Sequence, residues 1–151
     1  MKKNNKVLNF DMDGTIADLY SIPDWLDRIR AFDATPYAEA RPMVPMSALA
    51  RQLNRLQKAG YKLRIISWSS KESTPEYDAL VDCVKRQWLA QHLPSVHWDE
   101  IIITAYGVPK QTVGQNPGGI LFDDNMMVRE EWDGFAFCET QMMEVLRNLG
   151  R

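Results

Sequence analysis

The stretch Phe10-Asp11-Met12-Asp13-Gly14-Thr15 follows a short apolar run, Val7-Leu8-Asn9-Phe10, which is long enough for one buried strand. Its two aspartates therefore stand at the carboxyl tip of the predicted strand, with a glycine directly after them. In open α/β sheets, ligands bind at this edge. Two carboxylates so close together repel each other unless a positive group, such as a divalent cation, lies between them.

Four further segments are predicted as strands, and predicted helices lie between most of them. The strands are expected at 61–66, 101–104, 120–122 and 135–137, and the helices at 21–32, 46–59, 74–93, 126–132 and from 140 onward. Each strand is a short continuous apolar run, which is typical of strands buried on both faces. The sequence thus predicts an α/β fold with a three-layer, Rossmann-like parallel sheet of five strands and helices on both faces.

Residues 16–45 separate the first strand from the next long helix, and we expect them to form a short helical cap insert in a single domain that spans 1–151. Ser21 is predicted to cap the first helix of this insert, whereas 33–45 contains three prolines and is predicted as loop. Trp25, Phe32 and Tyr37 could stack on a base or sugar, but we favour a buried helix face for Trp25 and Phe32.

Two other helices have predicted faces and caps. The helix at 74–93 opens at Thr74-Pro75 and ends before Pro94, and the last helix is capped by Thr140. The inward face of the 74–93 helix is expected to comprise Tyr77, Leu80, Val81, Val84 and Trp88, with Cys83 on the same side.

Composition excludes several classes of protein. The 151 residues are 45% hydrophobic and 25% charged with a net charge of -2, so no global field attracts nucleic acid or an anionic membrane. Two cysteines, Cys83 and Cys138, are too few for a disulfide framework, which favours a reducing, cytoplasmic setting. The basic start at 1–6 resembles a signal peptide, but Asp11 and Asp13 interrupt the apolar segment that should follow. No apolar run approaches the ~20 residues of a membrane span.

Polar residues follow the other predicted strands as well. Ser67 comes after the second strand, Asp123 and Asp124 after the fourth, and Lys110 lies in the loop that leads to the fourth. Parallel strands would bring these side chains to one edge, together with the two aspartates of the first strand. Such a set suits Mg²⁺, which prefers oxygen ligands, and a carboxylate that attacks phosphorus. A hydroxyl and an ammonium group can hold phosphoryl oxygens as charge develops.

These residues resemble the four motifs of the haloacid dehalogenase-like (HAD) phosphatases. Asp11-Met12-Asp13-Gly14-Thr15 is similar to the first motif, D-x-D-G-[TV], and Ser67 to the second. Lys110 resembles the third motif and Asp123-Asp124 the paired acids of the fourth. The order of these motifs along the chain, and their positions relative to the predicted strands, agree with the family from Val7 to Asp124.

The resemblance implies a role for each motif. Asp11 would be the nucleophile and a Mg²⁺ ligand, and Asp13 the general acid/base, with its backbone carbonyl on the metal. Ser67 and Lys110 would bind the phosphoryl group, with Trp68 beside them in the substrate site. Asp124 would ligate the metal and Asp123 would lie behind it near Lys110, although the reverse order is also open.

The same comparison implies a reaction. Family dehalogenases and P-type ATPases lack an aspartate at the position of Asp13, so the resemblance implies a phosphatase that cleaves a phosphate monoester through an aspartyl-phosphate. The chain departs from the family in two places. The segment from Lys110 to Gly119 includes Pro117 and is too short for a long helix, and the cap insert is small.

The substrate stays open at this stage. We expect a small phosphorylated metabolite, with the family's deoxyribonucleotide phosphatases as one analogy, while a nucleic-acid end or a phosphoprotein is not excluded. A phosphotransferase of the same fold and a non-catalytic phosphate-binding protein are the alternative functions. Ser69 and Ser70 compete with Ser67 for its role.

Two other interpretations of the opening stretch carry less weight. An EF-hand calcium loop would begin at Asn9, but its twelfth position is Tyr20, where a bidentate glutamate is required. A plain Asp-Gly turn would be the default for Asp13-Gly14 alone, and the second acidic pair at 123–124 weakens it.

Overall fold

The structure is a computed structural model that describes residues 6–114 and 118–151. Residues 1–5 of the basic start at 1–6 lie outside the described residues, and so does Pro117. Within the described part, no helix combines the length and apolar character needed to cross a lipid bilayer.

A five-stranded sheet forms the centre of the molecule, and all its neighbouring strands are parallel. In spatial order the strands are β5 (Glu100–Thr104), β4 (Lys62–Trp68), β1 (Val7–Phe10), β6 (Ile120–Phe122) and β7 (Ala136–Phe137). Strand β1 is central, and its last residue, Phe10, is in register with Ile65 and Phe122. The carboxyl ends of β1, β4 and β6 therefore meet at one edge, as the sequence predicts.

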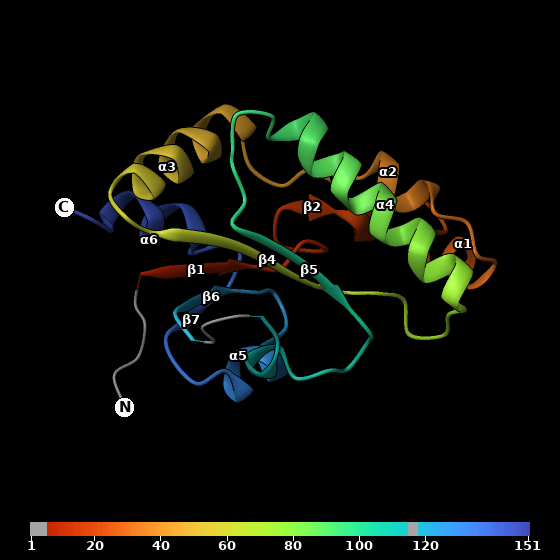
Figure 1. Cartoon of the computed structure of the whole chain (residues 1–151). Coiled ribbons are helices and arrows are strands. Elements are labelled where there is room, and N and C mark those ends of the chain that lie inside the picture. Colours follow the sequence, from red (N-terminus) through yellow and green to blue (C-terminus); the bar gives the residue numbers. More distant parts are fainter. Residues whose placement is uncertain (1–5, 115–117) are drawn as a thin grey trace.

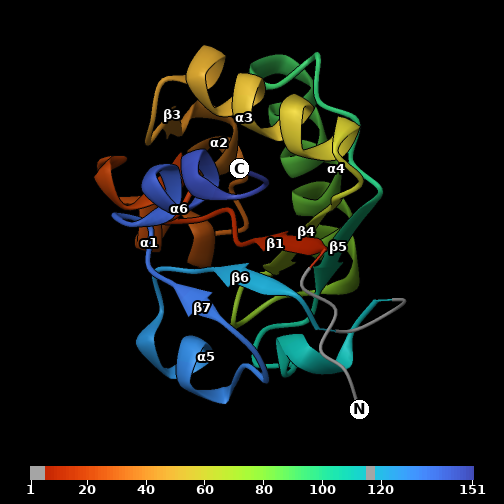
Figure 2. The same cartoon turned by 90° about the vertical axis from the view of Figure 1, so that its left-hand side faces the viewer.

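Helices cover both faces of this sheet (Figures 1 and 2). Helices α3 (Met46–Lys58), α4 (Pro75–His92) and α6 (Met142–Asn148) lie on one face, and α5 (Met126–Glu131) lies on the other. A large apolar cluster fills the first face, and a smaller one, which includes Ile66, Leu121 and Trp132, fills the second. The predicted three-layer, Rossmann-like α/β fold is thus confirmed.

The insert between β1 and α3 contains more regular structure than expected. It comprises β2 (Ala17–Asp18), a 3-10 helix (Leu19–Ser21), α1 (Trp25–Arg30), α2 (Thr35–Glu39) and β3 (Arg41–Pro42). Strands β2 and β3 pair antiparallel at its base. Leu19, Ile29 and Tyr37 of the insert pack on Tyr77 and Val81 of α4 in a separate apolar cluster. The insert is therefore held against α4, next to the edge where the strands end.

Three predictions for the insert are wrong. Ser21 does not cap a helix, because it closes the 3-10 helix, and α1 begins at Trp25 after Asp24 in a left-handed conformation with φ 56°. The 33–45 segment is not plain loop, because Pro36 occupies the first turn of α2, where a missing N–H costs nothing. Phe32 is half exposed and lies beyond the end of α1 at Arg30, so it is not part of a buried helix face, although its ring packs in a T-shaped arrangement on Tyr77.

Two predictions for the later helices are also wrong. Leu80 and Cys83 are exposed on α4, whereas Lys85 is buried there. The reason is that α4 packs against both the sheet and the insert, so its buried face is set by two neighbours. Thr140 does not cap α6, whose N-cap is Gln141 without a side-chain bond. The predicted cap of α4 is confirmed, since Thr74 Oγ1 accepts a hydrogen bond from the Tyr77 N–H at 3.1 Å.

Candidate active site

The end of β1 is held by backbone hydrogen bonds on both sides of Asp11. The Asp11 N–H donates to the Phe122 carbonyl at 3.0 Å, and the Met12 carbonyl accepts from the N–H groups of three residues of the following turn, Thr15, Ile16 and Ala17. Gly14 has a φ of +84°, and a Cβ there would lie 2.3 Å from Asp124 Oδ2. Glycine is therefore needed for the turn and for the approach of the second acidic pair.

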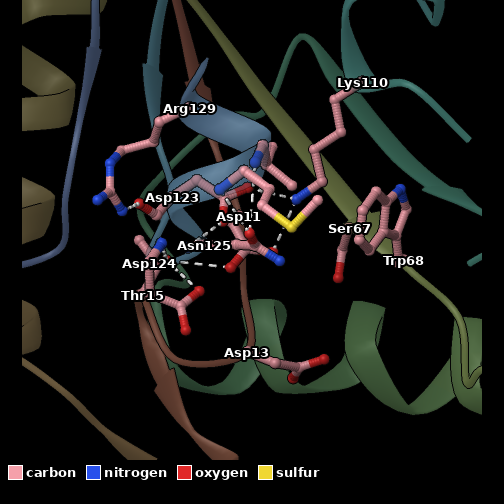
Figure 3. Close-up of polar contacts among 12 residues, drawn as sticks. Asp11, Asp13, Thr15, Ser67, Trp68, Lys110, Asp123, Asp124, Asn125 and Arg129 are labelled. Carbon is pink, nitrogen blue, oxygen red and sulfur yellow. Dashed lines mark hydrogen bonds and ion pairs between the residues drawn. The ribbon is translucent and has the colours of Figure 1, made fainter. Parts of the chain in front are cut away.

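Three carboxylates gather at this point. Asp11, Asp123 and Asp124 each offer an oxygen, and these oxygens all lie within 4.8 Å of one another. Thr15 connects the two strand ends: its Oγ1 donates to Asp11 Oδ2 at 3.0 Å and accepts from the Asp124 N–H at 3.1 Å. Figure 3 shows this group beside Asn125 and Arg129. The first and fourth motifs, far apart in sequence, thus share one site.

Lys110 lies beside the three carboxylates and is buried. Its Nζ donates to Asp11 Oδ1 at 3.0 Å and to Asp123 Oδ2 at 2.6 Å, and its amino group points toward Asp11 in Figure 3. Burial opposes the charge on Lys110, but the carboxylates of Asp11 and Asp123 outweigh it and raise the pKa of the ammonium group. Lys110 is therefore held as a cation at the centre of the site.

The two acids of the fourth motif differ in their surroundings. Asp123 is 1% exposed, and both its oxygens are engaged, one by Lys110 and the other by the Asn125 N–H at 2.9 Å. Asp124 is only partly buried and faces the cavity. Burial and the nearby Asp11 carboxylate raise the pKa of Asp123 to about 6 and that of Asp124 to about 8. The cluster thus holds more negative charge than Lys110 can balance, and its all-oxygen donor set suits a hard divalent cation such as Mg²⁺.

Asp13 is set apart from the three carboxylates. In Figure 3 its side chain points away from Asp11. Its Oδ2 accepts a hydrogen bond from Lys85 Nζ at 2.9 Å, and Lys85 also donates to Ser67 Oγ at 2.8 Å. Burial raises the pKa of Asp13, while the ammonium group of Lys85 acts in the opposite direction. The pKa of Asp13 is therefore raised above the ordinary carboxyl value, although Lys85 opposes the shift.

Sequence reasoning missed Lys85. The signal was present, because Lys85 is four residues after Val81 and three before Trp88, which puts it on the apolar face of a helix. A lysine in that position is rarely buried without a partner.

The three serines at and just beyond the end of β4 divide between two environments. Ser67 is 0% exposed and does not line the cavity, whereas Ser69 and Ser70 do. Trp68 also lines it: the indole Nε1–H donates to the Val108 carbonyl at 2.8 Å, and Lys110 Nζ lies 5.2 Å from the ring centroid. Ser69 and Ser70 thus share the cavity with the carboxylates, whereas Ser67 is bonded to Lys85.

A cavity of about 280 Å³ opens above the carboxylates. Asp11, Asp13, Asp124 and Lys110 form its polar floor. Its walls are mainly aromatic and aliphatic, with Tyr20, Trp25 and Leu26 from the insert and Trp68 and Tyr106 from the sheet side. The rings of Tyr20 and Trp25 pack edge to face with their centroids 4.9 Å apart, and the ring centroids of Trp68 and Tyr106 are 5.0 Å apart.

Of the three aromatic residues singled out from the sequence, two reach this cavity. Trp25 and Tyr37 line it, although Tyr37 is 6% exposed and its hydroxyl is bonded to Ser70 Oγ at 2.8 Å. Phe32 does not line it. Trp25 and Tyr37 are therefore the two of the three that line the cavity, and Trp25 is the more exposed of them.

The parallel sheet with helices on both faces defines a Rossmann-like α/β protein, with a helical insert and an acidic cluster at the strand ends. Among solved structures, the chain is similar to D,D-heptose 1,7-bisphosphate phosphatase from Burkholderia thailandensis, with a TM-score of 0.50 and 16% sequence identity. The match covers 85% of this chain and 70% of that one. At this identity the likeness establishes the fold alone. Neither a protein-family model nor a curated protein matches the sequence.

Proposed function

We propose that this chain is a Mg²⁺-dependent phosphatase that hydrolyses a phosphate monoester through an aspartyl-phosphate on Asp11. The observation that carries the proposal is the convergence of Asp11, Asp123, Asp124 and Lys110 at the carboxyl edge of β1 and β6. The resemblance to HAD phosphatase motifs and the phosphatase fold of the structural neighbour support it.

The metal would be held by Asp11, Asp124 and the backbone carbonyl of Asp13. Asp123 would stay behind this set, because both its oxygens already accept hydrogen bonds from Lys110 and Asn125. When bound, the cation screens the charge of the phosphoryl group from that of the nucleophile. Neutralisation by the cation would also offset the repulsion among three negatively charged carboxylates that share one site.

The chain's own side chains would carry the two chemical steps. In the first, an Asp11 carboxylate oxygen attacks phosphorus, the bond from phosphorus to the ester oxygen breaks, and Asp13 gives its proton to that oxygen. In the second, Asp13 takes a proton from water as the water attacks phosphorus, and phosphate leaves Asp11. Lys110 would hold the negative phosphoryl oxygens through both steps, with the hydroxyl of Ser67 as a second donor.

The walls of the cavity favour a substrate with a flat ring. Tyr20, Trp25, Trp68 and Tyr106 line the same cavity as the acidic residues, and aromatic side chains of this kind suit stacking on a base. A cavity of about 280 Å³ fits a small ligand rather than a protein segment. We therefore propose a small phosphorylated metabolite with an aromatic base, a nucleoside monophosphate, as the substrate class.

A panel of phosphate esters tests this function. We expect phosphate release with Mg²⁺ from nucleoside monophosphates at a higher kcat/KM than from sugar phosphates, phosphopeptides or phosphorylated DNA ends. Added alcohols separate the phosphotransferase alternative, which would yield a transferred phosphate ester. No release from any member, with phosphate binding retained, would favour the non-catalytic alternative and contradict the proposal.

Lys110→Ala should lower kcat on the order of 10²-fold, as the loss of a charge-stabilising donor does elsewhere. The reason is that Lys110 is the cation in contact with both Asp11 and Asp123. Steady-state hydrolysis of an aryl phosphate measures it, and Lys62→Ala, at a lysine whose side chain is 68% exposed on β4, is the matched control. An unchanged kcat would assign the role to another residue.

A further inference from the structure

The ammonium group of Lys85 is enclosed by three acceptors. Its Nζ donates to Asp13 Oδ2 at 2.9 Å, Ser67 Oγ at 2.8 Å and the Trp68 carbonyl at 2.8 Å. The side chain is 1% exposed, and the Tyr37 ring covers it with its centroid 4.9 Å away. A lysine has three N–H donors and no acceptor. All its donors are therefore used, and Lys85 cannot bind a substrate while these bonds persist.

The contact with Lys85 fixes the direction of the Ser67 hydroxyl. Because an ammonium group only donates, Ser67 Oγ must accept in this bond. The hydroxyl proton of Ser67 has no acceptor among the described residues. It is thus left to donate to a further oxygen, which is what binding a phosphoryl oxygen requires.

The same contact fixes the orientation of Asp13. Lys85 binds Oδ2, and no described donor contacts Oδ1. One carboxyl oxygen is therefore anchored and the other is left for proton transfer. Asp13 follows β1 and Ser67 lies near the end of β4, so Lys85 on α4 ties together groups from two neighbouring strands.

We propose that Lys85 is a positioning residue that acts through Ser67 and Asp13. It aims the Ser67 hydroxyl as a donor and holds the Asp13 carboxyl in place, without contact to the substrate. This inference rests on the proposed phosphatase function. It gives a residue of α4 a role in the site, although Lys85 belongs to none of the four motifs at the strand ends.

A double-mutant cycle tests the inference. Lys85→Met keeps the length of the apolar stem and removes all three donors, so kcat should fall on the order of 10²-fold with little change in KM. Ser67→Ala should lower kcat in the wild-type background. It should lower kcat much less in the Lys85→Met background, because the hydroxyl is then no longer aimed. Arg86→Met, which removes the neighbouring cation on the exposed side of α4, is the matched control and should retain full kcat.

The outcomes distinguish a failure of this inference from a failure of the proposed phosphatase function. Additive losses in the cycle, or an unchanged kcat in Lys85→Met, would overturn the inference and leave the phosphatase intact. A wild-type protein without phosphatase activity would overturn both. Lys85→Gln, which retains a side-chain donor, provides a second variant, and thermal melting checks that each is folded. If neither variant folds, Lys85 serves the stability of the fold and the positioning role is wrong.

Discussion

Asp11→Asn is expected to abolish hydrolysis of an aryl phosphate in the presence of Mg²⁺ while the protein stays folded. The amide has the shape of the carboxyl group, but it cannot attack phosphorus and carries no charge for the metal. Thr15 Oγ1 donates to Asp11 Oδ2, and the amide oxygen can accept that bond. The phosphate released in a steady-state assay measures the loss, and the melting temperature reports the fold.

A matched substitution separates this effect from general damage. Asp82→Asn removes a carboxylate that forms an ion pair with Arg86 on the surface of α4, at 2.7 Å. Exposed pairs of this kind contribute little, so this variant should keep both its activity and its melting temperature. Substantial turnover in Asp11→Asn would show that another group attacks the substrate.

Removal of Mg²⁺ should have an effect of similar size. A chelator is expected to eliminate turnover, and added Mg²⁺ to restore it, because the nucleophile and the phosphoryl group are both negative. A sodium salt at the same ionic strength is the control. Turnover that persists in the chelator would contradict the role of the metal.

The same cation should also stabilise the fold, and more so at high pH. The raised pKa values of Asp123, about 6, and Asp124, about 8, mean that the metal-free folded protein binds more protons than the unfolded chain. Its stability therefore falls as the pH rises from the ordinary carboxylate range toward 8. Mg²⁺ at 100 times its Kd adds about 2.7 kcal/mol of stability. The rise in melting temperature on adding Mg²⁺ should be larger at pH 8 than at pH 5, and an equal rise at both would contradict this account.

The sheet was predictable because its signals are local. Each of the five strands is an apolar run with breaking residues around it, and parallel strands necessarily bring their carboxyl ends to one edge. That rule alone predicts that Asp11 and Asp124 lie together, and the structure brings them together. The roles of these residues stay predictions until they are tested by substitution.

The insert and α4 were not predictable in the same way. Helices α1 and α2 contain 6 and 5 residues, which is too few for a clear helical period. The burial of Lys85 depends on Tyr37, Asp13 and Ser67, which are distant in the sequence. Contacts of this kind arise only from the packing of the insert, the sheet and α4 against one another.

The central claim is that Asp11 carries the phosphoryl group during turnover. The most direct test mixes the enzyme with Mg²⁺ and a reactive substrate, quenches the reaction in acid, and examines the peptide that contains Asp11 by mass spectrometry. The account predicts that this peptide gains the mass of one phosphoryl group, on Asp11, and that Asp11→Asn does not. A phosphoryl group on another residue, or an active enzyme that is never labelled, would contradict it.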